Sequence, residues 1–287
     1  MRLRRLWGAA VERLLLLASL LVIAAVVLIG LFLLWFGLPL FRFTSVGGFF
    51  GPGWYPLSDR FGSLPLILGS LLVTGIAMVV AVPLGIAGAI YLAEVAPRRW
   101  REVLKPVVEL LAAIPSVVIG FVGLIVLAPL IREAFHLDTG LTALTGGIAL
   151  GFMAVPTIVT ISEDALVAVP QAYREASLAL GATRLQTVMR AIVPAARGGL
   201  LAAVMLGLGR AIGETMAVLM ITGNAAVIPH SIFQPVRTLT ATLAVEMGET
   251  VRGSAHYHAL FMLGTVLFAI TFVVNLVADL AIHRSRR

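Results

Sequence analysis

Residues 175–216 read EASLALGATRLQTVMRAIVPAARGGLLAAVMLGLGRAIGETM, and the rest of the chain is organised around them. The first part, residues 175–194, is polar, carries arginines and lies between two strongly apolar runs. The second part, residues 207–216, places an arginine and a glutamate inside the next apolar run. Charged residues inside an apolar span are costly and mark functional positions. The pattern therefore indicates a segment on which another protein acts, followed by a span that handles something charged.

The composition places the chain in a bilayer. Of its 287 residues, 60% are hydrophobic and 12% are charged, whereas soluble domains carry about 25% charged residues. A helical span needs about 20 consecutive apolar residues, and the chain contains six such runs. The runs are continuous and lack the alternation of a membrane barrel, so they predict an all-α, polytopic membrane protein with six transmembrane helices. The runs are 14–37, 64–92, 106–131, 140–162, 196–222 and 259–282.

The net charge of +7 is explained by topology. Fifteen of the 21 lysines and arginines lie before the first run, in residues 98–105, in residues 174–197 and after the last run. The loops on the other side hold five, and Arg210 stays inside a span. Because basic loops remain in the cytoplasm, both termini are predicted to be cytoplasmic, in the cytoplasmic (inner) membrane. The distribution argues against a nucleic-acid partner and leaves membrane lipid as the surroundings.

Three segments are expected. Residues 1–63 comprise the N-terminal tail, a retained first helix and an irregular, exposed outer loop rich in glycine and proline. Residues 64–283 form the main transmembrane domain, with a cytoplasmic loop at about 163–195, and residues 284–287 form a basic cytoplasmic tail. The second run is longer than a bilayer is thick, so it must tilt, kink at Pro83 or protrude.

The remaining loops and helix contacts give two further expectations. Residues 94–105 are expected to form a short turn before a third helix that starts at Pro106. Glycines spaced by four allow close helix packing, and the candidate pairs are Gly147 with Gly151 and Gly209 with Gly213.

The polar segment predicts two short helices joined by a turn. Pro170 is placed to begin the first, and Gly181 is placed to end it in the left-handed conformation. Thr183 caps the second, with Gln186 completing a capping box. On this second helix, Leu185, Val188, Met189 and Ile192 are expected to share one face. Such an amphipathic unit outside the membrane either docks another protein or lies flat on the lipid surface.

This segment resembles the EAA loop of ABC importer permeases. The family pattern is Glu-Ala-Ala, three residues, Gly, nine residues and Ile-x-Leu-Pro, and it is matched here by Glu175, Ala176, Ser177, Gly181 and Pro194. Three positions depart through small or apolar replacements: Ser177, Ala191 and Val193. The resemblance implies the type I importer permease (MetI-like) fold. It also implies that the loop is a coupling helix that sits in a cleft of a separate ATP-binding subunit.

The chain itself lacks the ATP-binding loop that would drive transport. A Walker A loop ends in lysine followed by Ser or Thr, whereas Lys105, the single lysine, is followed by Pro106. We therefore expect a non-catalytic permease without a cofactor of its own, with ATP bound by the partner. The absence of cysteine excludes disulfides and thiolate metal sites.

Arg210 and Glu214 are the candidate pathway residues. If the helix continues through both, they share one face. They are then either a self-neutralising structural pair or an arginine that meets an anion while Glu214 holds it in place. Thr215 follows in the same motif and is included in the pathway.

The motif resembles phosphate-specific ABC importer permeases of the C type. The matching residues are 209–218, GRAIGETMAV, with Gly223-Asn224 beyond, and 114–118, IPSVV. The resemblance implies a heterodimeric pore with a second permease subunit, two ATP-binding subunits and an extracytoplasmic phosphate-binding protein. Sulfate or molybdate permeases share part of the motif and stay as alternatives. An ion-coupled secondary carrier would show two related halves, and we find no such repeat.

Other polar residues are expected to be inert. His256 and His258 are two positions apart, which does not place them on one helix face, and no nearby residue completes a metal site. Asp138, Glu246 and Glu249 are expected to be solvated in outer loops.

Overall fold

The computed structural model describes residues 2–285 and has six helices long and apolar enough to cross a membrane. This confirms the expected all-α architecture. Residues 286–287 of the expected basic tail lie outside the described residues. The candidate spans are Val11–Arg42, Leu64–Val95, Ser116–Ala134, Ala143–Val167, Arg184–Gly213 and Ala255–Val277.

The regular elements follow the chain in a simple order. The helices are α1 (Arg2–Gly37), α2 (Val46–Phe49), α3 (Leu64–Ile90), α4 (Arg98–Ala112), α5 (Ser116–Val122), α6 (Ala128–Ala134), α7 (Ala143–Val167), α8 (Gln171–Ala179), α9 (Arg184–Thr187), α10 (Val193–Gly213), α11 (Met216–Ile221), α12 (Leu239–Glu246) and α13 (Ala255–Ser285). The strands β1 (Trp54–Tyr55) and β2 (Arg60–Phe61) pair antiparallel as a small hairpin.

Helices α3 and α7 pack against each other along most of their length. Glycine makes this close approach possible, because a Cβ on Gly147 would lie 2.5 Å from Cβ of Ile76 and one on Gly151 would lie 2.9 Å from Cβ of Val80. The prediction of close packing is confirmed for this pair. It is wrong for Gly209 and Gly213, since within residues 2–285 no atom of another segment lies nearer than 3.9 Å to either Cβ position.

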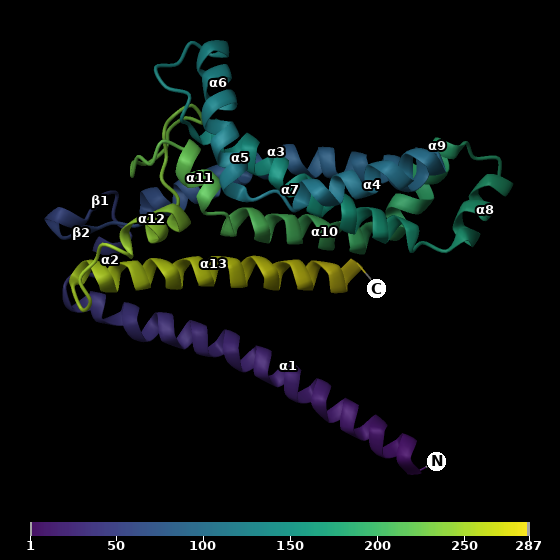
Figure 1. The fold of residues 1–287 in the computed structure, drawn as a ribbon, viewed down its shortest axis with the longest axis horizontal. Coiled ribbons are helices and arrows are strands. Elements are labelled where there is room, and N and C mark those ends of the chain that lie inside the picture. Colours follow the sequence, from purple (N-terminus) through teal and green to yellow (C-terminus); the bar gives the residue numbers. More distant parts are fainter. Residues whose placement is uncertain (1, 286–287) are drawn as a thin grey trace.

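The other long helices add to this centre side by side. α10 packs on α7, α13 packs on α10, and α1 contacts α13 near Gly30 and Gly37 before diverging from it (Figure 1). The start of α1, the end of α13 and α8 lie at one end of the molecule, which we call the α8 end. The β-hairpin and α12 lie at the opposite end, which we call the hairpin end.

The third span differs from its expected form. The segment predicted to be a turn before Pro106 is helix α4, which runs through that proline to Ala112. It folds as a helix because its basic residues reach acidic partners on α7, among them Lys105 with Glu163. Pro115 then separates α4 from the membrane-capable stretch Ser116–Ala134, which comprises α5, a π-helical turn and α6.

The second and fifth spans are lengthened by π-helical turns at the α8 end. α3 passes Pro83 without a break and continues as a π-helical turn, Tyr91–Val95. α9 joins α10 through a second π-helical turn, Val188–Ile192. The expected second short helix is therefore the beginning of the fifth span, and its separate existence is a wrong prediction.

The hairpin end is a packed core, which contradicts the expectation of an irregular, exposed outer loop. Phe49 and Trp54 are 1% and 2% exposed and cluster with Leu40, Leu239 and Leu260. Residues before 64 thus share a hydrophobic core with α12 and α13. The glycine-rich loop folds because its aromatic side chains find apolar surface on these distant helices.

Candidate functional site

Arg210 lies one turn before the end of α10, and its side chain is exposed. One terminal nitrogen donates to Oγ1 of Thr157 (3.0 Å) on α7, and the other donates to the carbonyl of Ala112 (3.2 Å) at the end of α4. A guanidinium has five N–H donors, so other donors stay available to a ligand. Among the described residues, no ion pair includes Arg210. Its positive charge is therefore not neutralised by a carboxylate.

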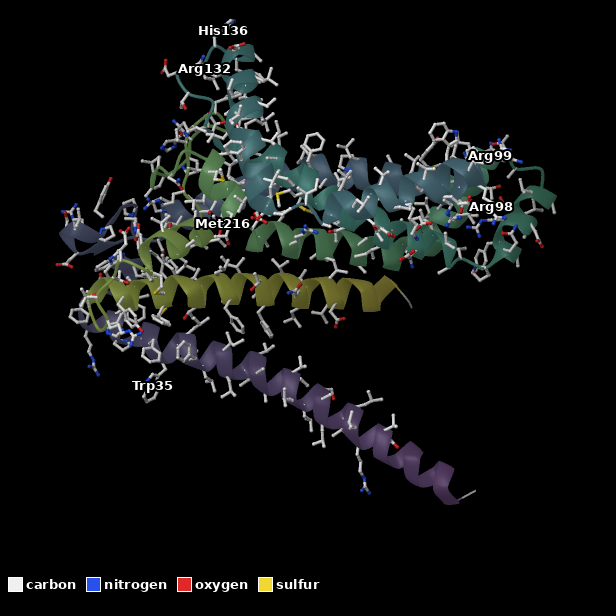
Figure 2. The ribbon with its side chains drawn as sticks, viewed as in Figure 1. Trp35, Arg98, Arg99, Arg132, His136 and Met216 are labelled. Atoms are coloured by element: carbon white, nitrogen blue, oxygen red, sulfur yellow. The ribbon has the colours of Figure 1, made fainter. Side chains whose placement is uncertain are left out.

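Glu214 performs a different task from the one expected. α10 ends at Gly213, and Glu214 has an extended backbone with ψ of 133°. Its Oε1 accepts the backbone N–H groups of Thr215 (3.0 Å), Met216 (3.1 Å) and Ala217 (3.3 Å). Figure 2 labels Met216 at the start of α11, beside the end of α10. Glu214 therefore caps α11, a favourable position for a carboxylate.

The expected shared helix face of Arg210 and Glu214 is consequently wrong. A pair four residues apart meets only when the helix continues through both, and here the helix stops between them. Thr215 lies in this break and donates its hydroxyl to the carbonyl of Gly213 (3.2 Å). The structure brings Arg210, Glu214 and Thr215 to one break in the fifth helix, and Arg210 takes partners from α4 and α7.

The segment with the EAA pattern protrudes at the α8 end (Figure 1). α8 begins after Pro170, and Gly181 turns the chain with φ of +84°, as expected. Thr183 and Gln186 form the predicted capping box, with bonds of 3.3 Å and 2.9 Å. These local predictions are confirmed.

Of the residues that match the EAA pattern, some are exposed at the surface and one bonds a buried residue of the neighbouring helix. Glu175, Ala176 and Pro194 are exposed, while the hydroxyl of Ser177 bonds the buried hydroxyl of Thr187 at 2.9 Å. Serine in place of alanine therefore ties α8 to α9. The departure from the family pattern gains a hydrogen bond between the two arms of the turn.

The apolar face expected on the second arm is split. Leu185 and Met189 are 72% and 53% exposed, whereas Val188 and Ile192 are 8% and 0% exposed. Leu180, at the tip of the turn, is 89% exposed. Exposed apolar side chains around one turn are typical of a docking surface, and the buried ones anchor the arm to the bundle.

Two clusters of charged side chains at the α8 end were not anticipated from the sequence. Glu163 on α7 is buried and pairs with Arg101 and Lys105 of α4. Glu94, after α3, pairs with Arg174 of α8. The available signal was an acidic residue near the end of an apolar run, but its partners are about 60 or 80 positions distant in the chain.

A third cluster lies at the hairpin end. Glu246 is not solvated, as was expected, because its carboxylate binds Arg237 (2.7 Å), His256 (2.8 Å) and the indole N–H of Trp54 (3.0 Å). This carboxylate therefore joins the hairpin to α12 and α13. Over the described residues, no group of three or more His, Cys, Asp or Glu side chains is arranged to hold a metal ion.

Comparison with known proteins identifies the family. The family described as "Binding-protein-dependent transport system inner membrane component" matches residues 81–287. The chain is 44% identical over 260 residues to the probable ABC transporter permease protein YqgH of Bacillus subtilis (strain 168), covering 89% of this chain and 84% of that protein. It is 39% identical over 250 residues to the phosphate transport system permease protein PstC of Mesorhizobium japonicum, covering 80% and 76%.

Solved structures share the fold at low sequence identity. A bacterial alginate ABC transporter, in complex with an alginate pentasaccharide-bound periplasmic protein, matches with a TM-score of 0.65 and 18% identity, covering 99% of this chain and 98% of that chain. The inward-facing MetNI methionine ABC transporter matches with a TM-score of 0.60 and 19% identity, covering 76% and 94%. The predicted MetI-like fold is confirmed.

The family match spans well over half of the chain, and the curated relatives are matched over most of their own length. The six membrane-capable helices agree with a multi-pass protein of the inner membrane. The chain therefore belongs to the binding-protein-dependent transport system inner membrane components, the family of ABC transporter permeases that includes the phosphate transport system permease PstC.

Proposed function

We propose that the chain is the permease subunit of an ATP-driven ABC importer that moves inorganic phosphate across the cytoplasmic membrane. Similarity to permeases named for phosphate transport supports this substrate. The observation that carries the proposal is the exposed, carboxylate-free guanidinium of Arg210 at the break between α10 and α11.

The chemistry of Arg210 suits phosphate. Phosphate at neutral pH carries one to two negative charges, which an uncharged side chain cannot compensate in a low-dielectric passage. Arginine presents a planar fork that bonds two phosphate oxygens at once, which the point charge of lysine cannot reproduce. The bond to Thr157 on α7 orients this fork before the anion arrives.

The anion meets Arg210 on its exposed side. The cavity beside Glu214 has a volume of about 10 Å³, room for at most one water molecule. An oxyanion is larger than this cavity, which Arg210 does not line, so we place the anion at the exposed side of Arg210, where the opposite wall of the site comes from outside this chain. A second permease subunit supplies that wall, and the pore is a heterodimer.

The remaining partners follow from the two ends of the molecule. Two ATP-binding subunits hydrolyse ATP, and one of them docks at α8, so the permease itself is non-catalytic and needs no cofactor. An extracytoplasmic phosphate-binding protein delivers the anion at the hairpin end. Both termini and α8 then lie on the cytoplasmic side, in agreement with the excess of basic residues there.

Substitution of Arg210 tests the proposal. Arg210→Gln removes the charge, and losing hydrogen bonds to a charged group lowers uptake by about 10- to 100-fold. Arg210→Lys keeps the charge without the fork and is expected to recover only part of the rate. The measurement is uptake of radiolabelled phosphate into cells that lack their own phosphate importers, with the amount of assembled complex determined in parallel.

The controls distinguish the effect of losing the Arg210 charge from loss of any surface charge, from failed assembly and from transport of another oxyanion. Arg13→Gln removes an exposed arginine on α1 and is expected to leave uptake unchanged. Because Glu214 caps α11, Arg210→Gln does not leave that carboxylate without partners. Excess sulfate or molybdate is expected not to reduce the uptake of radiolabelled phosphate. Normal uptake by Arg210→Gln, or competition by either oxyanion as strong as by phosphate, would overturn the assignment.

A further inference from the structure

A buried carboxylate fastens α4 to α7. The side chain of Glu163 is 1% exposed, and its two oxygens bind Arg101 and Nζ of Lys105, the latter at 2.5 Å. Lys105 also contacts Asp164 at 3.1 Å. Removing one partner from a buried pair is strongly destabilising. This cluster therefore resists separation of the two helices.

Lys105 is protonated and positively charged at physiological pH. Its hydrogen bond to Glu163 raises the pKa of Lys105 above the ordinary value of 10.5. The stabilisation that depends on this charge is complete below pH 10.5 and is lost only as the pH rises through the raised pKa.

A second cluster fastens α8 to the same group of helices. The guanidinium of Arg174 pairs with Glu94 at the end of the second span, and their side chains are 16% and 10% exposed. Arg174 also donates to the carbonyls of Val169 (2.8 Å) and Leu166 (3.1 Å) at the end of α7. The position of α8 is thus tied to α3 and α7, and through Glu163 to α4.

Two helices lead from the charged clusters at the α8 end to Arg210, and each acts as a rigid rod. One is the continuous helix from α9 through α10, which carries Arg210 itself. The other is α4, whose last carbonyl, that of Ala112, accepts a bond from Arg210. Gly181 separates the arm fastened to α4 from the arm that leads into α10, and no other segment approaches within 4 Å of its Cβ position. Movement at this turn, which would break the bond between Ser177 and Thr187, shifts α10 relative to α4.

We propose that Glu94 and Glu163 are positioning residues that join α8 to α4, so that displacement of α8 makes or breaks the bond between Ala112 and Arg210. When the bond breaks, a donor of Arg210 is released for the anion; when it forms, the carbonyl competes with the anion. The proposal rests on the proposed function for the docking of the ATPase at α8 and for the role of Arg210. It assigns to two carboxylates outside the pathway a role in coupling ATP hydrolysis to anion release.

The test compares coupling in Glu94→Gln, Glu163→Gln and the double variant. Each change keeps the side-chain size and removes the charge. The phosphate taken up per ATP hydrolysed is expected to fall by about 5- to 150-fold, the usual range of coupling between two sites. Glu102→Gln is the matched control, because Glu102 lies on α4 in an exposed pair with Arg98 that joins no second element. This control is expected to keep the wild-type ratio.

A distance measurement adds a readout that loss of stability would not mimic. The chain has no cysteine, so spin labels can be placed at exposed positions of α4 and α8, Val103→Cys and Ala172→Cys, in a complex whose other subunits are cysteine-free. The distance between the labels is expected to be equal in the nucleotide-free and ATP-bound states of the complex. In the double variant the distance is expected to differ between the two states.

Two outcomes would overturn the inference: an α4–α8 distance that changes with nucleotide in the otherwise unmodified complex, or an uptake-to-hydrolysis ratio in Glu94→Gln equal to that of Glu102→Gln. Glu94→Gln decides the test if Glu163→Gln does not assemble, since Arg174 keeps its bonds to two carbonyls. Absence of phosphate uptake by the unmodified complex would instead refute the proposed function. The comparison of α4–α8 distances requires ATP but no phosphate transport, so it would still test the inference.

Discussion

At the scale of single residues, Glu214 stabilises the start of a helix. Three backbone N–H groups point at one of its oxygens, and its own carbonyl accepts the hydroxyl of Thr240 at 2.8 Å. These bonds fix the break that follows α10. Glu214 therefore positions the start of α11, while Thr157 and Ala112 hold the guanidinium of Arg210.

If Glu214 acts as a helix cap, two substitutions at this position should have different effects on uptake and stability. Glu214→Gln keeps an oxygen that can accept the same N–H groups, so uptake and thermal stability are expected to stay close to wild type. Glu214→Ala removes the cap and is expected to cost about 0.5–2 kcal/mol of stability, with lower uptake. The measurements are the unfolding temperature of the purified complex and phosphate uptake. A loss of uptake in Glu214→Gln as large as in Arg210→Gln would mean that the negative charge itself is required.

At the scale of elements, the turn between α8 and α9 depends on one glycine. Gly181 has φ of +84°, and a Cβ there would meet no other segment within 4 Å. The difficulty for another residue is thus backbone strain alone, about 1–2 kcal/mol for most L-residues. Asparagine tolerates this conformation, while a β-branched residue resists it.

Two variants of Gly181 therefore differ in the backbone strain that they introduce. Gly181→Val is expected to move α9 relative to α8, so that the permease inserts into the membrane but loses the ATPase subunit on purification. Gly181→Asn is expected to retain it. The measurement is the ratio of ATPase to permease after affinity purification in detergent. Full retention by Gly181→Val would exclude this turn as the docking site.

At the scale of the whole molecule, the two ends differ in charge. Arg98 and Arg99 lie at the α8 end, whereas Arg132 and His136 lie at the tip of α6, far from them (Figure 2). The basic residues concentrate at the α8 end, which supports the proposed cytoplasmic position of that end. In the proposed orientation, the hairpin end with its packed aromatic core faces the opposite side.

Cysteine labelling tests this orientation. Leu57, in the loop of the hairpin, is 105% exposed and Leu180, at the turn between α8 and α9, is 89% exposed. In intact spheroplasts, Leu57→Cys is expected to react with a membrane-impermeant maleimide, and Leu180→Cys only after permeabilisation. The parent chain is its own unlabelled control, because it contains no cysteine. The reverse pattern would invert the topology and remove α8 from the side on which ATP is available.

The sequence by itself determined the features that depend on neighbouring residues. The six spans follow from continuous apolar runs, because a bilayer selects helices by length and hydropathy. The left-handed Gly181 and the capping box of Thr183 with Gln186 follow from hydrogen bonds that close within a few residues. The EAA pattern of residues 175–194 was recognisable for the same reason.

Only the tertiary structure decided which distant residues meet. Glu94 and Arg174 are 80 positions apart, and Trp54 and Glu246 are 192 apart, so no local pattern links them. The break after α10 at Gly213 also involves a distant residue, since Thr240 donates its hydroxyl to the carbonyl of Glu214 (2.8 Å). This break gives Arg210 and Glu214 different partners. Sequence spacing describes contacts within an intact helix, whereas packing determines where a helix stops and what its polar residues touch.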